Sequence, residues 1–123
     1  MLPMFAQVSA ACDIARIVVC KLSGRTFAPY DWATAATDMD KLREGVQSAI
    51  AFLKSVEAEE MEGDMGREIV LPVRNADPMH FTAQTFVERW ATPNFHFHVT
   101  MAYGLLRHGG VDLGKLDFLG KIA

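Results

Sequence analysis

Apolar residues recur every three or four positions in two long segments of the chain, which is the spacing of amphipathic helices. The pattern predicts one helix over residues 5–22, stopped by Gly24, and a second over residues 37–57, with Thr37 and Asp38 as capping candidates. Residues 25–36 between them are expected to form a loop. The predicted buried stripes are Phe5, Val8, Cys12, Ala15, Val19 and Leu22 in the first helix, and Met39, Leu42, Val46, Ala49, Leu53 and Val56 in the second.

The pattern changes after an acidic, glycine-containing segment at residues 57–66. Apolar runs at residues 69–73 and 79–81 flank a short polar turn, which predicts a small β-hairpin with Pro72 in an edge strand. Thr82 is placed to cap a third helical segment, and Pro93 is expected to break or kink it near Thr92.

The last helix is predicted to resume at Asn94 and to end at Gly109. Its apolar stripe consists of Phe95, His98, Ala102 and Leu105. The remaining tail is rich in glycine but keeps several large apolar residues, so we expect it to wrap back onto the helices. The fold class predicted is all-α: an up-and-down helical bundle of three main helices, the last kinked at Pro93, with a small hairpin before the last helix.

Composition narrows the class of protein further. A chain of 123 residues, half of them apolar, fits a single domain over residues 1–123 with its own core. With 12 Lys and Arg against 15 Asp and Glu and no cluster of cations, nucleic acid is not expected as a partner. Asp13, Arg16 and Lys21 interrupt the longest apolar stretch, so no membrane span is expected.

The ends and cysteines of the chain favour a cytoplasmic location. Residues 1–5 have neither a basic region nor a small-residue cleavage site, so they do not resemble a secretory signal. Cys12 and Cys20 lie on one predicted helix, about 12 Å apart along its axis, and cannot form a disulfide with each other. We expect both to be small core residues of a protein in a reducing compartment.

The C-terminal part of the chain contains a long run of motif residues. They are Pro-Asn-Phe-His-Phe-His-Val-Thr-Met-Ala-Tyr at 93–103, Leu-Leu-Arg-His-Gly-Gly-Val-Asp-Leu-Gly-Lys at 105–115 and Asp-Phe-Leu-Gly at 117–120. This run closely resembles the signature of an uncharacterised domain-of-unknown-function family of bacteria and fungi. Weaker matches are Gln7-Val8 with Cys12-Asp13, and residues 69–72 leading into Phe81-Thr82. The resemblance implies a fold similar to the DinB/YfiT-like superfamily of four-helix up-and-down bundles, whose relatives include metal-dependent thiol transferases.

Two features of the chain depart from that family pattern. Met4-Phe5 aligns with the start of the family's second helix, so the first helix has no counterpart in this sequence. Three remaining helices would leave an open apolar groove. We expect a second copy of the chain to close it, making a homo-oligomer, or the chain to be a fragment of marginal stability; a cooperatively folded monomer would contradict this.

The second departure concerns metal ligands. Metal-binding members of the superfamily place one His on the second helix and a His-x-x-x-His pair on the last, because residues four apart share a helix face. Here Asn94 and Ala102 flank His98 at that spacing, and Arg89 stands where many family members carry a further His. No cofactor is therefore expected, with His98 as the one candidate ligand for a divalent metal.

The candidate pocket predicted from the sequence comprises His98, Asn94, Asp13 and Tyr103. His98 lies on an apolar stripe and is either a buried histidine satisfied by hydrogen bonds or a ligand or acid-base group oriented by Asp13. Asp13 is alternatively an ion-pair partner of Arg16 or Arg107, which we favour. Tyr103 is a candidate proton donor or a packing residue.

These residues leave the function open between classes. The favoured interpretation is a small homodimeric module that binds a ligand or serves in stress, with a small molecule as candidate partner. The alternative is a DinB-like metal-dependent transferase acting on a thiol or small molecule. A bundle that only binds another protein is the third interpretation.

Overall fold

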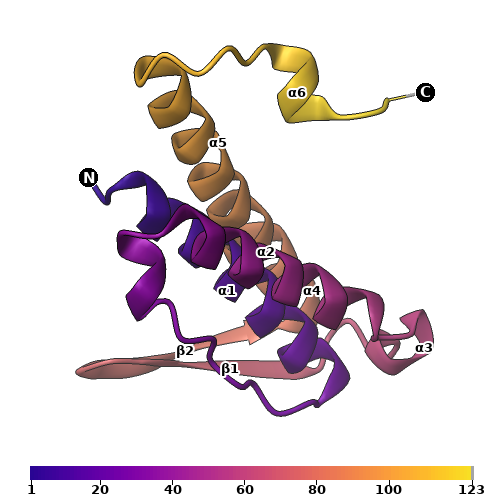
Figure 1. The fold of residues 1–123 in the computed structure, drawn as a ribbon. Coiled ribbons are helices and arrows are strands. Elements are labelled where there is room, and N and C mark those ends of the chain that lie inside the picture. Colours follow the sequence, from indigo (N-terminus) through magenta and orange to yellow (C-terminus); the bar gives the residue numbers. More distant parts are fainter. Residues whose placement is uncertain (123) are drawn as a thin grey trace.

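The computed structural model describes residues 1–122. Its elements in chain order are α1 (Met4–Ser23), η1 (Ala33–Ala36), α2 (Met39–Lys54), α3 (Ala58–Met61), β1 (Glu68–Val73), β2 (Ala76–Thr82), α4 (Ala83–Thr85), η2 (Phe86–Ala91), α5 (Thr92–His108) and α6 (Lys115–Leu119). The protein is mostly helical with a small two-stranded sheet. α1 packs against both α2 and α5, and the β1–β2 hairpin lies across one end of the helices (Figure 1). None of the helices within residues 1–122 has both the length and the apolar character needed to cross a membrane.

The predicted stop of the first helix and the predicted start of the second are confirmed by their caps, but α2 ends at Lys54 and not at residue 57. Gly24 follows α1 with a φ of 77°, and its N–H donates to the carbonyl of Cys20 at 2.9 Å. That backbone conformation suits glycine because it has no Cβ. Asp38 precedes α2, and its carboxylate accepts hydrogen bonds from the N–H groups of Asp40 and Lys41. The first turn of α2 therefore has partners for two of its free N–H groups.

The hairpin is confirmed, and it closes one end of the molecule. β1 and β2 pair antiparallel, with Ile69 opposite Phe81. Ile69 and Leu71 are buried and join Phe86 in the core cluster, against which Ile17, Val18, Leu22, Phe81 and Trp90 pack. Phe86 is 0% exposed and stacks on Trp90 with their ring centroids 5.2 Å apart. We call these packed residues the hairpin core.

Of the two responses predicted at Pro93, a break or a kink, the break does not occur, since the chain stays helical from Ala83 to His108. Pro93 has no N–H and its ring crowds the carbonyl four residues earlier, so an ordinary α-turn cannot precede it. Residues 86–91 adopt a π-helical turn, η2, which widens the helix at this point. The predicted cap is confirmed: the Thr82 hydroxyl accepts from the N–H of Thr85 at 3.1 Å.

The predicted buried stripe of the first helix is shifted around its axis. Val8, Cys12, Ala15 and Val19 are only half-buried, whereas the buried residues of α1 are Gln7, Ala11, Ile14 and Cys20. α1 is apolar over more of its circumference than one stripe, so spacing alone did not identify the covered side. In α2 the predicted stripe is confirmed in part: Leu42 and Ala49 are buried, Val46, Leu53 and Val56 are half-buried, and Met39 is 50% exposed.

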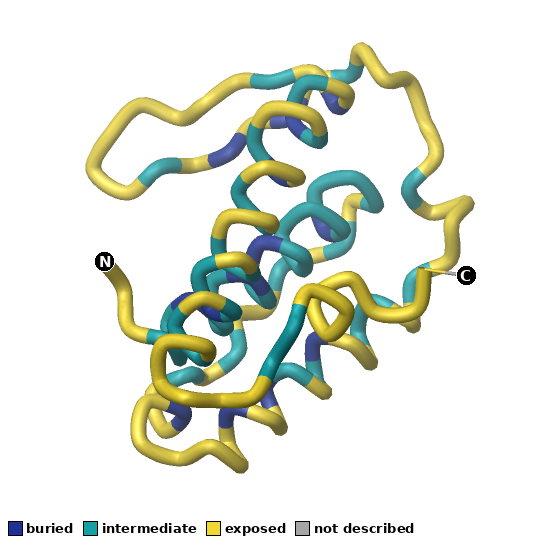
Figure 2. Tube along the Cα trace, turned by 90° about the horizontal axis from the view of Figure 1, so that it is seen from above, coloured by how far each residue is buried: buried dark blue, intermediate teal, exposed yellow. Residues whose placement is uncertain are grey.

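The tail does not wrap back onto the helices as expected. It contains the short helix α6, and Lys115 to Ile122 are all exposed, as Figure 2 shows. Leu116 and Ile122 are each 71% exposed. One contact ties the segment to α5, where the ring of Phe118 lies 5.6 Å from that of Tyr103. The C-terminal segment, residues 111–122, therefore presents apolar side chains to solvent.

Candidate functional site

His98 joins α5 to α1 through a side chain that the sequence did not single out. Its Nδ1 lies 2.7 Å from Oε1 of Gln7, which is 1% exposed. The amide nitrogen of Gln7 donates to the carbonyl of Leu2 at 3.3 Å, so the amide oxygen is the atom that faces the imidazole. Because that oxygen only accepts, Nδ1 of His98 carries the proton and donates it. His98 is thus a half-buried histidine with a strong partner across the helix interface.

Asp13 is not brought together with His98. Residues 7 and 13 lie six positions apart on α1 and point about 120° away from each other around the helix, so they meet different neighbours. Asp13 accepts a hydrogen bond from the indole N–H of Trp32 at 3.0 Å. Burial raises the pKa of the Asp13 carboxyl, opposed by the Trp32 hydrogen bond and by Arg16. The less favoured alternative, in which Asp13 orients the imidazole of His98, is therefore not observed.

The expected ion pairs of Asp13 are also not observed in the described chain. Arg16 donates to the hydroxyl of Ser48 at 3.3 Å and lies over the ring of Phe52 at 5.5 Å. Arg107 donates to the Tyr103 hydroxyl at 3.4 Å. Asp13 instead anchors the loop between α1 and α2, because it holds the indole of Trp32.

Trp32 also depends on a glycine. A Cβ placed on Gly45 of α2 would collide with the Trp32 ring, so the indole packs directly on the α2 backbone. Only glycine permits this approach. Asp13, Trp32 and Gly45 therefore form one structural anchor rather than part of a reactive site.

Asn94 and Tyr103 lie on different sides of α5. Asn94 is one turn before His98, shares its face and is half-buried. Tyr103 lines a separate small cavity of about 200 Å³ with Thr100, Lys115 and Phe118. Of the four candidate residues, the structure places only Asn94 beside His98.

The residues around His98 do not fit a metal centre. Within residues 1–122, no three or more His, Cys, Asp or Glu side chains are grouped closely enough to hold one ion. Nδ1 of His98 is already engaged by Gln7, whose amide is a weak ligand for zinc-type metals. His80 lies in the hairpin, 2.8 Å from Glu68.

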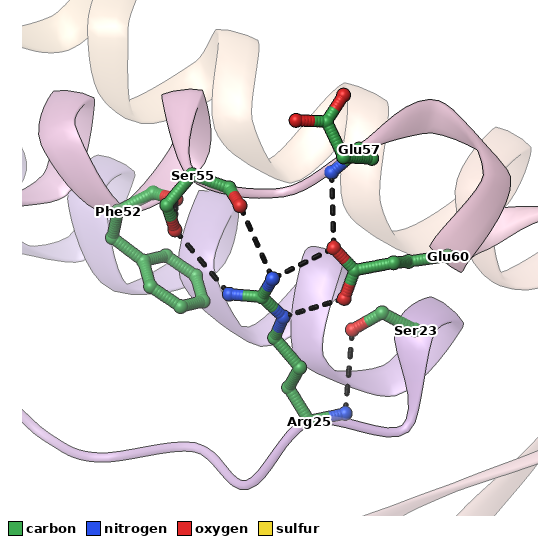
Figure 3. A network of polar contacts seen from close by, with 6 residues as sticks. All are labelled: Ser23, Arg25, Phe52, Ser55, Glu57 and Glu60. Carbon is green, nitrogen blue, oxygen red and sulfur yellow. Dashed lines mark hydrogen bonds and ion pairs between the residues drawn. The ribbon is translucent and has the colours of Figure 1, made fainter.

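The acidic segment has a structural role at the ends of α1 and α2, as Figure 3 shows. Nε and Nη2 of Arg25 donate to the two carboxylate oxygens of Glu60 at 2.8 and 2.7 Å. Arg25 also donates to the carbonyl of Ser55 at 3.1 Å, and Glu60 accepts from the N–H of Glu57 at 3.1 Å. The hydrogen bonds from Arg25 lower the pKa of Glu60. This network fastens the chain leaving α1 to the end of α2.

An open groove runs along α1, between α2 and α5. It comprises two adjoining hollows of about 310 and 270 Å³ that share Ala15, Leu53 and Phe95. The larger hollow is lined only by apolar side chains and cysteine: Val8, Ala11, Cys12 and Ala15 from α1, Val46, Ala49, Ile50 and Leu53 from α2, and Phe95, Val99 and Ala102 from α5. We call both hollows together the α1 groove. It collects most of the stripe residues that the sequence predicted to be buried.

Cys12 in the α1 groove is not a reactive thiol. Burial raises the pKa of its side chain to about 11, with the charge of Asp13 acting in the same direction. The thiol therefore stays protonated at neutral pH and behaves as a small apolar residue. Both cysteines are free in the structure, as the sequence predicted.

Comparison with known proteins places the chain among helical domains. A family model described as "Domain of unknown function (DUF1993)" matches residues 1–119. A solved structure of a DinB family member protein from Shewanella denitrificans is similar over 99% of this chain and 67% of that chain, with a TM-score of 0.81 and 28% identity. These findings confirm the resemblance inferred from the C-terminal signature. No curated protein matches the sequence.

Proposed function

Because this chain belongs to the DUF1993 family, which has no established function, we propose a function from its own surface: a small-molecule-binding module that works as a homodimer. The module is built on a DinB-like up-and-down helical bundle. The observation that supports the homodimer is the α1 groove, whose larger hollow is lined by three helices and has no charged side chain in its lining.

The α1 groove has the character of a surface that is covered in solution. Ile50 at its edge is 38% exposed, and the half-buried stripes of α1, α2 and α5 all meet there. Burying apolar surface gains about 25 cal/mol per Å², so an open groove of this kind favours association.

A second copy of the chain is the occupant that suits the groove. The same molecule exposes apolar side chains in its C-terminal segment, with Leu119 44% exposed and Leu116 71% exposed. In a two-fold dimer the C-terminal segment of each copy can lie in the α1 groove of the other. The symmetric interface then contains this contact twice and covers the groove and the C-terminal segment of both copies. Such an arrangement closes on itself and does not form a filament.

A metal-dependent transferase has less support from these residues. His98 uses Nδ1 to hold Gln7, and Asp13 is occupied by Trp32. We propose that the protein carries no stoichiometric divalent metal. Elemental analysis of untagged protein and of a folded His98→Ala variant tests this: about one ion per chain, lost in the variant, would support the enzyme instead.

The proposal also places the protein in the cytoplasm, where its two free cysteines stay reduced.

Light scattering on a matched pair of variants tests the dimer. Ile50→Lys puts a charge in the α1 groove and should give a folded monomer. Met79→Lys makes the same change in the hairpin, at a side chain that is also 38% exposed, and should leave the dimer intact. Equal masses for wild type and both variants would contradict the proposed interface.

A further inference from the structure

A second concave site lies at the other end of α1, outside the α1 groove. It is a cleft of about 490 Å³ between the last turns of α1, the segment that follows it, and β1. Its walls are largely apolar and are contributed by Ile17, Phe27, Leu71 and Pro72. Such a volume is within the roughly 300–1,000 Å³ of small-molecule pockets. We call it the Lys21 cleft.

The charged residues of the Lys21 cleft have one sign. Lys21 and Arg25 line it, and no acidic residue does, although the whole chain has a net charge of −3. The charge of Arg25 is already matched, since its guanidinium binds both carboxylate oxygens of Glu60 (Figure 3). Among residues 1–122, Lys21 has no ion-pair partner within 4.0 Å. Its ammonium is the cation left to meet a ligand.

We propose that the Lys21 cleft binds a small molecule with an apolar body and one carboxylate, such as a medium-chain fatty acid. The apolar walls take the hydrocarbon, and Lys21 forms a charge-assisted hydrogen bond with the carboxylate. This inference names the ligand class of the proposed binding module but does not depend on its dimer, because the cleft is formed within one chain.

Other ligand classes fit the cleft less well. A neutral apolar molecule would cover Lys21 without giving its charge a partner, which is costly. A phosphate or polyphosphate needs several free hydrogen-bond donors. In this cleft Lys21 is the one cation without an ion-pair partner, and four of the lining residues are apolar. The repulsion of a carboxylate by the end of α1 is reduced, because two of its last four carbonyls have partners: Cys20 accepts from Gly24 and Leu22 accepts from Arg67.

Titration calorimetry with octanoate and 1-octanol tests the proposal on the full chain. The wild type should bind octanoate at least tenfold more tightly than octanol, because only the acid pairs with Lys21. Lys21→Met should remove that preference while keeping the apolar walls. Lys54→Met, a change of the same kind in the last turn of α2, should leave it unchanged.

The position of binding is checked by amide resonances. Octanoate should shift those of Thr26 and Phe27, which line the cleft, in the wild type and in Ile50→Lys alike. Equal binding of acid and alcohol, no binding of octanoate, or shifts confined to the α1 groove would each overturn the proposal. Light scattering on the same samples measures the mass in solution separately. A failure of the proposed ligand binding can therefore be told apart from a failure of the proposed dimer.

Discussion

Two apolar regions of α1 are covered to different extents. Ile17 and Leu22, towards its C-terminal end, pack in the hairpin core, where Phe86 is 0% exposed. Val8 and Cys12, in its N-terminal half, line the α1 groove, and neither of these is buried. The two regions differ in what packs over them. The hairpin and η2 cover the hairpin core, whereas the α1 groove is lined by three helices and stays open on its remaining side. Apolar spacing thus indicates which residues favour burial, but another element must supply that burial.

The largest expected effect is in the hairpin core. Phe86→Ala removes a ring with no exposed surface, and it should lower the free energy of unfolding by about 3–5 kcal/mol. In the Ile50→Lys background, where the α1 groove is open, Val99→Ala should cost about 1 kcal/mol or less, since its side chain is only half-buried. Urea unfolding measures both. Similar losses for the two variants would remove the distinction between the closed and the open region.

Next in size is the glycine under Trp32. Alanine at Gly45 should gain about 1 kcal/mol of helix propensity but lose more, about 1–3 kcal/mol, because its Cβ collides with the indole. A shift in tryptophan fluorescence should accompany the net loss. Gly104→Ala in α5 is the control: its Cβ would meet nothing within 4 Å, so this variant should be slightly more stable than wild type. A stabilised Gly45→Ala would contradict the packing of Trp32.

The contact between Gln7 and His98 should be worth less than the hairpin core. Gln7→Leu leaves Nδ1–H of His98 without its acceptor and should cost about 1–3 kcal/mol. The double variant with His98→Leu should recover part of that loss, because neither polar partner is then left alone. Gln47→Leu, on the exposed side of α2, should change stability little. Strictly additive losses at positions 7 and 98 would show that the two side chains do not interact.

A pH dependence of stability is expected to arise in the α1 groove. The pKa of Cys12 is about 11 in the folded chain and 9.0 as its ordinary value, so between these pH values the folded state holds the proton more often than the unfolded state. Stability should therefore fall as pH rises from 9 to 11. Cys12→Ala should fall less steeply than wild type over that range in urea unfolding. Parallel pH profiles would mean that burial does not perturb this thiol.

The sequence predicted the helices and strands better than it predicted which of them pack against each other. Local chemistry marks the end of α1 at Gly24 and the start of α2 at Asp38, since a positive φ and a capping carboxylate act within one turn. The hairpin followed from its two apolar runs. The continuous helix around Pro93 did not follow from the sequence. A widened turn and a broken helix both relieve the clash between the proline ring and the carbonyl four residues earlier.

The candidate site was harder to predict because it depends on contacts between distant segments. The place of His98 on an apolar stripe identifies it, but its partner Gln7 is 91 residues away and lies outside the stripe predicted for the first helix. A polar residue at helical spacing from Ala11 and Ile14 was the available signal. Trp32 lay in a segment without periodicity, so nothing local linked it to Asp13.

The most direct test of the account is the melting temperature of the wild-type protein measured at increasing concentration, together with its mass in solution. A homodimer joined through the α1 groove predicts the mass of two chains and a melting temperature that rises with concentration, because unfolding then separates the copies. A species with the mass of one chain, melting cooperatively at a temperature independent of concentration, would contradict the account.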